Sequence, residues 1–128
     1  MPRWQYKPDE EPKRKHAWSR DYAGFVEVGG VFVGKCPHNL PLSRAEEMAN
    51  EGIPYFPKRW TRSYPNRIYV IDGGVLYRIA WTVPGVSCHG FPEHPSEWIK
   101  LPRTLRAAVL DRARELGQLD QVEKWLGV

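Results

Sequence analysis

Two pairs of adjacent glycines, Gly29-Gly30 and Gly73-Gly74, each separate two runs rich in β-branched and aromatic residues. A two-residue hairpin turn needs positive φ at its central positions, and glycine adopts that conformation without the steric cost that other residues meet. The glycine pairs therefore predict two β-hairpins, over residues 25–33 and 67–81. We expect their four antiparallel strands to form one sheet with a single buried face.

Three helical patterns accompany the hairpins. In the first, Ser43 is typical of an N-cap, Glu46 stands three residues later as in a capping box, and Gly52 follows the last turn. The apolar stripe of this helix consists of Ala45, Met48 and Ala49. Apolar residues recur at helical spacing over 103–116, and a second short helix begins near Leu119. These patterns predict an α+β domain with about three helices packed on one face of the four-stranded antiparallel sheet, and a proline-spaced loop over 53–65.

The 128 residues are enough for one domain, which we assign to residues 21–128. Residues 1–20 combine prolines with an excess of basic side chains and lack apolar periodicity, so we expect a mobile basic arm there. Three large rings, Trp4, Tyr6 and Trp18, leave a docked extended segment as the alternative. The basic run 12–16 would extend a surface for a polyanion.

No run of apolar residues approaches the roughly 20 that a membrane-spanning helix needs, and the N-terminus carries no apolar signal segment. We therefore expect no membrane partner, and a cytoplasmic protein or one exported without a cleavable signal. The two cysteines are too few for a disulfide scaffold.

A basic and aromatic stretch over 55–78 contains a single acid, Asp72. Cationic side chains neutralise phosphates and flat rings stack on unpaired bases, so this composition is typical of a surface for single-stranded nucleic acid. The candidate binding residues are Lys58, Arg59, Trp60, Arg62, Tyr64, Arg67 and Tyr69. The alternative is that the rings of the predicted strands serve only core or cross-strand packing.

Histidines and cysteines follow each hairpin closely, as Cys36-Pro37-His38 and Cys88-His89. Histidine titrates near neutral pH, so His89 with His38 or His94 would supply a general base and a general acid for phosphodiester cleavage. The set Cys36, His38, Cys88 and His89 has the residue types of a zinc site, but its spacing matches no zinc motif, and we expect neither a metal nor another cofactor. A cysteine activated by a histidine is a further alternative.

Three functions remain open. The leading hypothesis is a small binding module whose basic aromatic loop holds a polyanion, with nucleic acid favoured, or an acidic protein partner, consistent with 19 basic against 15 acidic residues. The second is a small histidine-dependent hydrolase or nuclease, whose size and charge are those of bacterial toxin domains as a class. The third is a protein-interaction or inhibitor domain anchored by exposed tryptophans.

Overall fold

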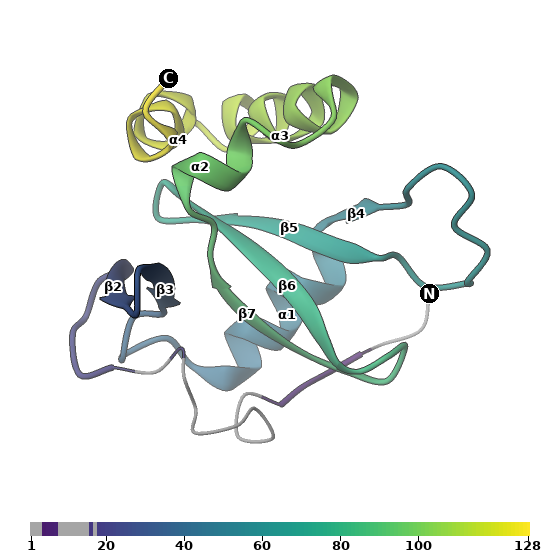
Figure 1. Cartoon of the computed structure of the whole chain (residues 1–128), viewed down its shortest axis with the longest axis horizontal. Helices are drawn as coiled ribbons and strands as arrows, with labels where there is room; N and C mark the ends of the chain where they lie inside the picture. Colours follow the sequence, from purple (N-terminus) through teal and green to yellow (C-terminus); the bar gives the residue numbers. More distant parts are fainter. Residues whose placement is uncertain (1–3, 8–15, 17) are drawn as a thin grey trace.

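The structure is a computed structural model that describes residues 4–7, 16 and 18–128 (Figure 1). The strands in this part of the chain are β1 (Gln5–Tyr6), β2 (Gly24–Val28), β3 (Val31–Lys35), β4 (Ile53–Tyr55), β5 (Arg67–Asp72), β6 (Val75–Val83) and β7 (Ser87–Pro92). The helices are α1 (Leu42–Glu51), α2 (Pro95–Trp98), α3 (Arg103–Glu115) and α4 (Leu119–Leu126). The α+β class expected from the sequence is therefore confirmed.

Both predicted hairpin turns are confirmed. The φ angles are 57° and 80° at Gly29 and Gly30, and 57° and 78° at Gly73 and Gly74. These turns join β2 to β3 and β5 to β6 as antiparallel pairs. The local signal was sufficient because positive φ at two successive residues is a constraint on those residues alone.

The predicted four-stranded antiparallel sheet is wrong. Strands β5 and β6 belong to a five-stranded mixed sheet of order β1-β7-β6-β5-β4, whereas β2 and β3 form a separate two-stranded sheet. Strand β1 runs parallel to β7, with Gln5 opposite Ser87, and the other neighbouring pairs are antiparallel. The edge strands β1 and β4 have only two and three residues, too few for a period-two pattern. The expectation of a loop throughout 53–65 is therefore also wrong for β4.

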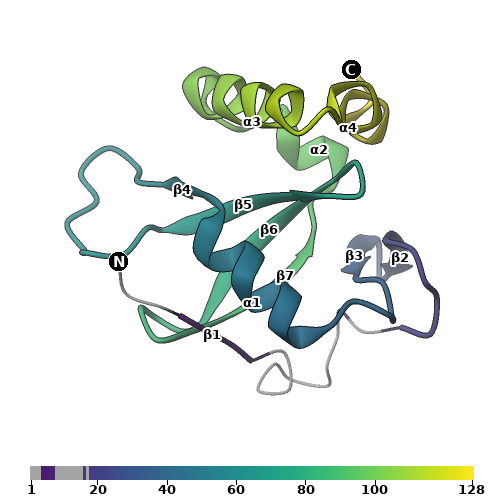
Figure 2. The same cartoon turned by 180° about the vertical axis from the view of Figure 1, so that it is seen from behind.

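Helices cover both faces of the five-stranded sheet, so the expectation that they share one face is wrong (Figures 1 and 2). Helix α1 packs Met48 and Ala49 against Ile68, Val70 and Ile79 on one face. The core on the other face, below α2, α3 and α4, is formed mainly by Tyr69, Ile71, Leu76, Trp98, Leu105, Val109, Val122 and Leu126. Because β5 is buried on both sides, four consecutive residues from Ile68 to Ile71 are buried. Each fully buried aliphatic side chain stabilises the fold by about 1.5–3 kcal/mol.

Helix α1 holds the short edge strand β1 through side chains. The amide of Asn50 accepts a hydrogen bond from the backbone N–H of Trp4 (2.8 Å) and donates one to the carbonyl of Trp4 (3.0 Å). A carboxylate oxygen of Glu46 accepts from the backbone N–H of Tyr6 (3.4 Å). The predicted capping box is wrong, because α1 starts at Leu42 after Pro41 and has no side-chain cap. Glu46 thus contacts β1, and the indole of Trp4 is buried.

Of the basic run expected at residues 12–16, residues 12–15 lie outside the described residues and only His16 is described. Among the helices of the described segments, none has the length and apolar character that crossing a membrane requires.

Candidate functional site

The sheet face that carries the C-terminal helices is covered at one end only. The strand register pairs Tyr55 with Arg67 and Ala80 with His89. Continued by one residue, the register that pairs Ile68 with Ile79 sets Arg67 beside Ala80, so these four residues form one row across β4, β5, β6 and β7. All four residues of this row are half-buried, whereas Tyr69 and Leu76 further along the same face are fully buried. The row is therefore the open part of this face, and it carries a guanidinium group near one end and an imidazole at the other.

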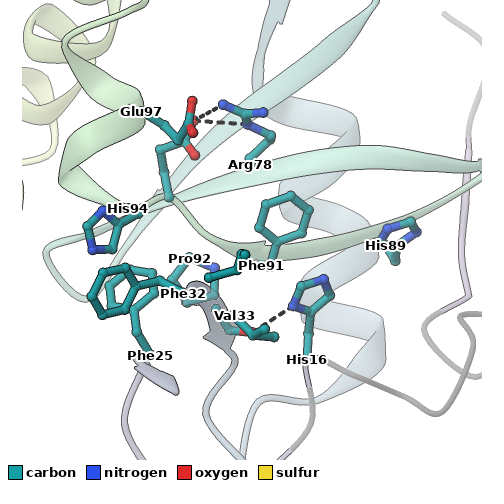
Figure 3. Close-up of a pocket in the computed structure, with 13 residues that line it drawn as sticks. His16, Phe25, Phe32, Val33, Arg78, His89, Phe91, Pro92, His94 and Glu97 are labelled. Atoms are coloured by element: carbon teal, nitrogen blue, oxygen red, sulfur yellow. Dashed lines mark hydrogen bonds and ion pairs between the residues drawn. The ribbon is translucent and has the colours of Figure 1, made fainter. Parts of the chain in front are cut away.

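A pocket of about 550 Å³ adjoins the imidazole end of the row, between the β2–β3 hairpin and β7 (Figure 3). Its lining residues are His16, Phe25, Val31, Phe32, Val33, Gly34, Arg78, His89, Phe91, Pro92, Glu93, His94 and Glu97. His94, Phe25 and Phe32 lie at one side, and His16 and His89 lie at the other. The pocket thus has an aromatic side and a side with two imidazoles, within the size range of small-molecule sites.

His16 and His89 approach each other although they are far apart in the sequence. Their ring centroids are 6.2 Å apart and the ring planes differ by 15°. His16 Nδ1 lies 2.6 Å from the carbonyl oxygen of Gly34, and His89 Nδ1 lies 2.8 Å from the Thr82 hydroxyl oxygen. A carbonyl can only accept, so Nδ1 of His16 carries the hydrogen, and in the neutral ring the lone pair is on Nε2. This is the tautomer that a base acting through Nε2 requires.

His94 has a structural task at the aromatic side of the pocket. Its Nδ1 accepts from the backbone N–H of Ser96 (3.1 Å) and lies 2.7 Å from the Ser96 hydroxyl, so His94 caps α2. The ring of Phe32 stacks on it at 4.5 Å between centroids, and Phe25 meets it edge-on at 4.8 Å. His94 thus helps to build the aromatic wall of the pocket together with Phe25 and Phe32.

The two arginines of this face differ in charge balance. Arg78 donates from Nε and Nη2 to one oxygen of Glu93, at 2.9 and 2.6 Å, and the Glu93 side chain is only 2% exposed. Burial raises the pKa of Glu93, and the Arg78 guanidinium lowers it by less. Arg67 instead donates to the Tyr69 hydroxyl (3.2 Å) and lies over the Tyr55 ring, and no carboxylate within the described ranges pairs with it. Arg67 is thus the cation of the open face whose charge is not neutralised by an ion pair.

The pocket unites two of the three histidines chosen from the sequence, His89 and His94. His38 is exposed and is not part of its lining. Sequence reasoning did not select His16 as a pocket residue, because it stands at the end of a basic run and carries no other signal. Its place depends on the β2–β3 hairpin folding back onto β7, a contact between distant segments.

The cysteines are not arranged for the alternatives considered from the sequence. Cys88 is fully buried on the α1 face, where burial raises its pKa to about 12, while its neighbour His89 lies on the opposite face. The Cys36 thiol donates to the carbonyl of Gly90 (3.2 Å). Within the described residues, no three His, Cys, Asp or Glu side chains are grouped closely enough to hold a metal ion.

The basic loop between β4 and β5 keeps three exposed cations, Lys58, Arg59 and Arg62. Its rings are less accessible than the sequence suggested. Trp60 and Tyr64 are half-buried, and Tyr69 is completely buried. Trp4, Trp18, Trp81, Trp98 and Trp125 are also buried or half-buried, so no tryptophan is available as a fully exposed anchor.

Comparison of the chain with protein-family models, with curated proteins and with solved structures finds no match. The residues of the pocket and of the adjoining row are therefore the basis on which a function is proposed.

Proposed function

We propose that this protein is a small ribonuclease that cleaves single-stranded RNA by general acid–base catalysis, with His16 and His89 as the catalytic pair. The observation that carries the proposal is the approach of these two imidazoles, with ring centroids 6.2 Å apart, in a pocket bordered by an aromatic wall and by the open row of Arg67. Two imidazoles on one reacting phosphate can remove and deliver a proton in the same reaction.

The tautomer of His16 supports its role as the base. With Nδ1–H held by the Gly34 carbonyl, Nε2 of His16 accepts the proton of the ribose 2′-OH as the 2′ oxygen attacks phosphorus. The bond between phosphorus and O5′ breaks as protonated His89 donates a proton to O5′. The products are a 2′,3′-cyclic phosphate end and a free 5′-OH end, and the next proton exchange with water restores both histidines.

The nucleophile required for this reaction favours RNA over DNA. Cys88 is buried behind the sheet with a raised pKa, and the Cys36 thiol donates to a backbone carbonyl. The Thr82 hydroxyl oxygen lies 2.8 Å from His89 Nδ1, where it accepts a hydrogen bond from the protonated imidazole and orients the proposed acid. A substrate that brings its own hydroxyl to the phosphate avoids the need for a protein nucleophile, and the 2′-OH is the group that distinguishes RNA from DNA.

The surroundings of the pair suit a nucleotide. Arg67 stands two strands from His89, about 10 Å between backbones for strands about 4.8 Å apart, and its guanidinium lies over Tyr55 on the side away from β7. It therefore suits a phosphate that neighbours the one held at the two imidazoles. The rings of Phe25, Phe32 and His94 offer a wall against which a base can pack.

The test uses the purified chain and a single-stranded RNA oligonucleotide with a fluorophore and a quencher. His16→Asn and His89→Asn should each lower kcat/KM by about 10²–10⁴, the usual contribution of a general acid or base. His38→Asn, on an exposed side chain outside the pocket, is the matched control and should keep the wild-type rate. A plot of kcat/KM against pH should be bell-shaped for the wild-type chain, and each histidine variant should remove one limb of that curve.

The substrate arm of the test uses an otherwise identical oligonucleotide with 2′-deoxyribose. It should not be cleaved, and mass spectrometry of the RNA products should find 2′,3′-cyclic phosphate. Cleavage of RNA at the wild-type rate by both histidine variants, or no cleavage by the wild-type chain, overturns the proposal. Equal cleavage of the deoxy substrate overturns the 2′-OH mechanism.

A further inference from the structure

The β4–β5 loop extends away from the sheet on the side opposite the β2–β3 hairpin (Figure 1). Lys58, Arg59 and Arg62 are exposed on this loop, and none of them pairs with a carboxylate in the part of the chain that the structure describes. The sequence has no Asp or Glu from Ile53 to Ile71. Three positive charges thus stand together without local neutralisation, which is the electrostatic pattern of a phosphate-binding surface.

Aromatic packing fixes the conformation of this loop. The Trp60 indole N–H donates to the carbonyl of Tyr64 (2.6 Å), and the Tyr64 ring meets Trp81 edge-on at 5.3 Å between centroids. The Trp81 indole donates to the carbonyl of Pro65 (2.8 Å), which ties the end of the loop to β6. Gly85 lets the Tyr64 ring approach closely, because a Cβ there would lie 2.7 Å from it.

A second sign of a fixed backbone is Arg59, whose φ is 71° although it is not glycine. Such a conformation persists only where the surrounding structure holds it, and it is found preferentially at functional sites. The adjacent N–H of Trp60 is bound to the carbonyl of Pro57 (2.9 Å), which closes the turn containing Lys58 and Arg59. The backbone that presents the cations is therefore ordered before a ligand arrives, which reduces the entropic cost of binding.

The loop is continuous with the proposed catalytic row. It leaves the sheet after Tyr55 and returns at Arg67, and the guanidinium of Arg67 lies 5.3 Å from the centre of the Tyr55 ring. From Arg67 the row runs through Ala80 to His89. A strand whose reacting phosphate lies at His16 and His89 therefore has its next phosphates directed past Arg67 and Tyr55 toward the loop.

We propose that Lys58, Arg59 and Arg62 form a phosphate-binding subsite for the part of a single-stranded RNA that lies several nucleotides from the bond being cleaved. The choice of RNA rests on the proposed function, whereas the subsite itself is measurable without catalysis. The exposed ring of Phe56, at 51% exposure, adds a stacking platform at the start of the loop.

The binding experiment uses the full chain and a fluorescein-labelled 12-nucleotide 2′-O-methyl RNA, which cannot be cleaved by its own 2′ oxygen. Fluorescence anisotropy is measured from 50 to 300 mM KCl. The loop variant is Lys58→Ala/Arg59→Gly/Arg62→Ala, with glycine at 59 because it adopts the positive φ without strain. The control variant, Arg103→Ala/Arg114→Ala/Lys124→Ala, removes the same number of exposed cations from α3 and α4.

The loop variant should bind about 100-fold more weakly at 0.1 M salt, and the slope of log affinity against log salt should become shallower by about 2. Both values follow from about 0.7 counterions released per phosphate contact to a single strand, for three contacts. The control should change affinity by less than about threefold. Equal losses in the two variants, or no loss in the loop variant, overturn the subsite.

A cleavage assay tests the subsite independently of the binding experiment. For the 12-nucleotide RNA the loop variant should raise KM and leave kcat within about twofold, and for a dinucleotide substrate it should change neither. A wild-type chain that binds the probe through the loop but cleaves no RNA refutes the ribonuclease proposal and keeps the subsite. A chain that cleaves RNA with the same KM in the loop variant keeps the ribonuclease proposal and refutes the subsite.

Discussion

Replacement of Arg78 by methionine should test the electrostatics of the pocket wall, because it leaves the Glu93 carboxylate without its cation. The Glu93 side chain is 2% exposed and that of Arg78 is 20% exposed, so the carboxylate cannot recover its hydration in the folded chain. Removal of one partner of a buried pair costs about 3–5 kcal/mol. Because water reaches one side of Arg78, we expect the lower end, a loss of about 3 kcal/mol in the free energy of unfolding at pH 7.5.

The loss of unfolding free energy in Arg78→Met should be smaller at low pH than at pH 7.5. Burial raises the pKa of Glu93 above its ordinary value of 4.5, so the folded chain binds this proton more readily than the unfolded chain. The stability contributed by protonated Glu93 is therefore present below about pH 4.5 and is lost as the pH rises through the pKa of Glu93 in the folded chain. Arg78 lowers the pKa of Glu93, so without Arg78 the stability contributed by protonated Glu93 persists to higher pH. The deficit of Arg78→Met relative to wild type should accordingly shrink between pH 7.5 and pH 5.

Urea unfolding followed by tryptophan fluorescence measures both effects. With a slope of about 2 kcal/mol per molar urea, the variant's midpoint should fall by about 1.5 M at pH 7.5. In the double variant Arg78→Met/Glu93→Gln the neutral amide should recover at least half of the loss and remove its pH dependence. A deficit below about 1 kcal/mol, or one that is the same at both pH values, would refute the description of Glu93 as a buried charge compensated by Arg78.

Three further outcomes are expected. Gly74→Ala should destabilise the fold by at least twice as much as Gly73→Ala in urea unfolding, because both residues have positive φ but only a Cβ at 74 would lie 2.4 Å from Gln121 Cβ; equal losses would contradict this. In a Cys36→Ser variant, Cys88 should react with a disulfide reagent at pH 8 only after unfolding, because burial raises its pKa to about 12; rapid labelling of the folded chain would disagree. Gly85→Ala should cost about 1–3 kcal/mol and weaken RNA binding, because φ at Gly85 is 75° and the new Cβ meets the Tyr64 ring at 2.7 Å; unchanged binding would show that this contact does not hold the loop.

The features predicted correctly from the sequence are those fixed by neighbouring residues. The glycine pairs set the turns, and Ala45, Met48 and Ala49 are the buried stripe of α1 as expected. The choice of strand partners was wrong because it depends on segments far apart in the chain. The uninterrupted apolar run of Ile68 to Ile71 did carry a signal, since a strand buried on both faces has no alternation, and it could have predicted helices on both sides of the sheet.

The candidate site could be predicted only in part for the same reason. His89 and His94 stand close together in a loop-like sequence, whereas nothing near His16 indicates that it will meet them. What brings His16 to His89 is the close approach of β3 to β7 at Gly34, where a Cβ would lie 2.8 Å from the carbonyl oxygen of Pro92. The same glycine supplies the carbonyl that holds His16 Nδ1. Gly34 thus both allows the hairpin to pack on the sheet and orients the proposed base. A sequence pattern predicts neither contact, because Pro92 and His16 are both distant from Gly34 along the chain.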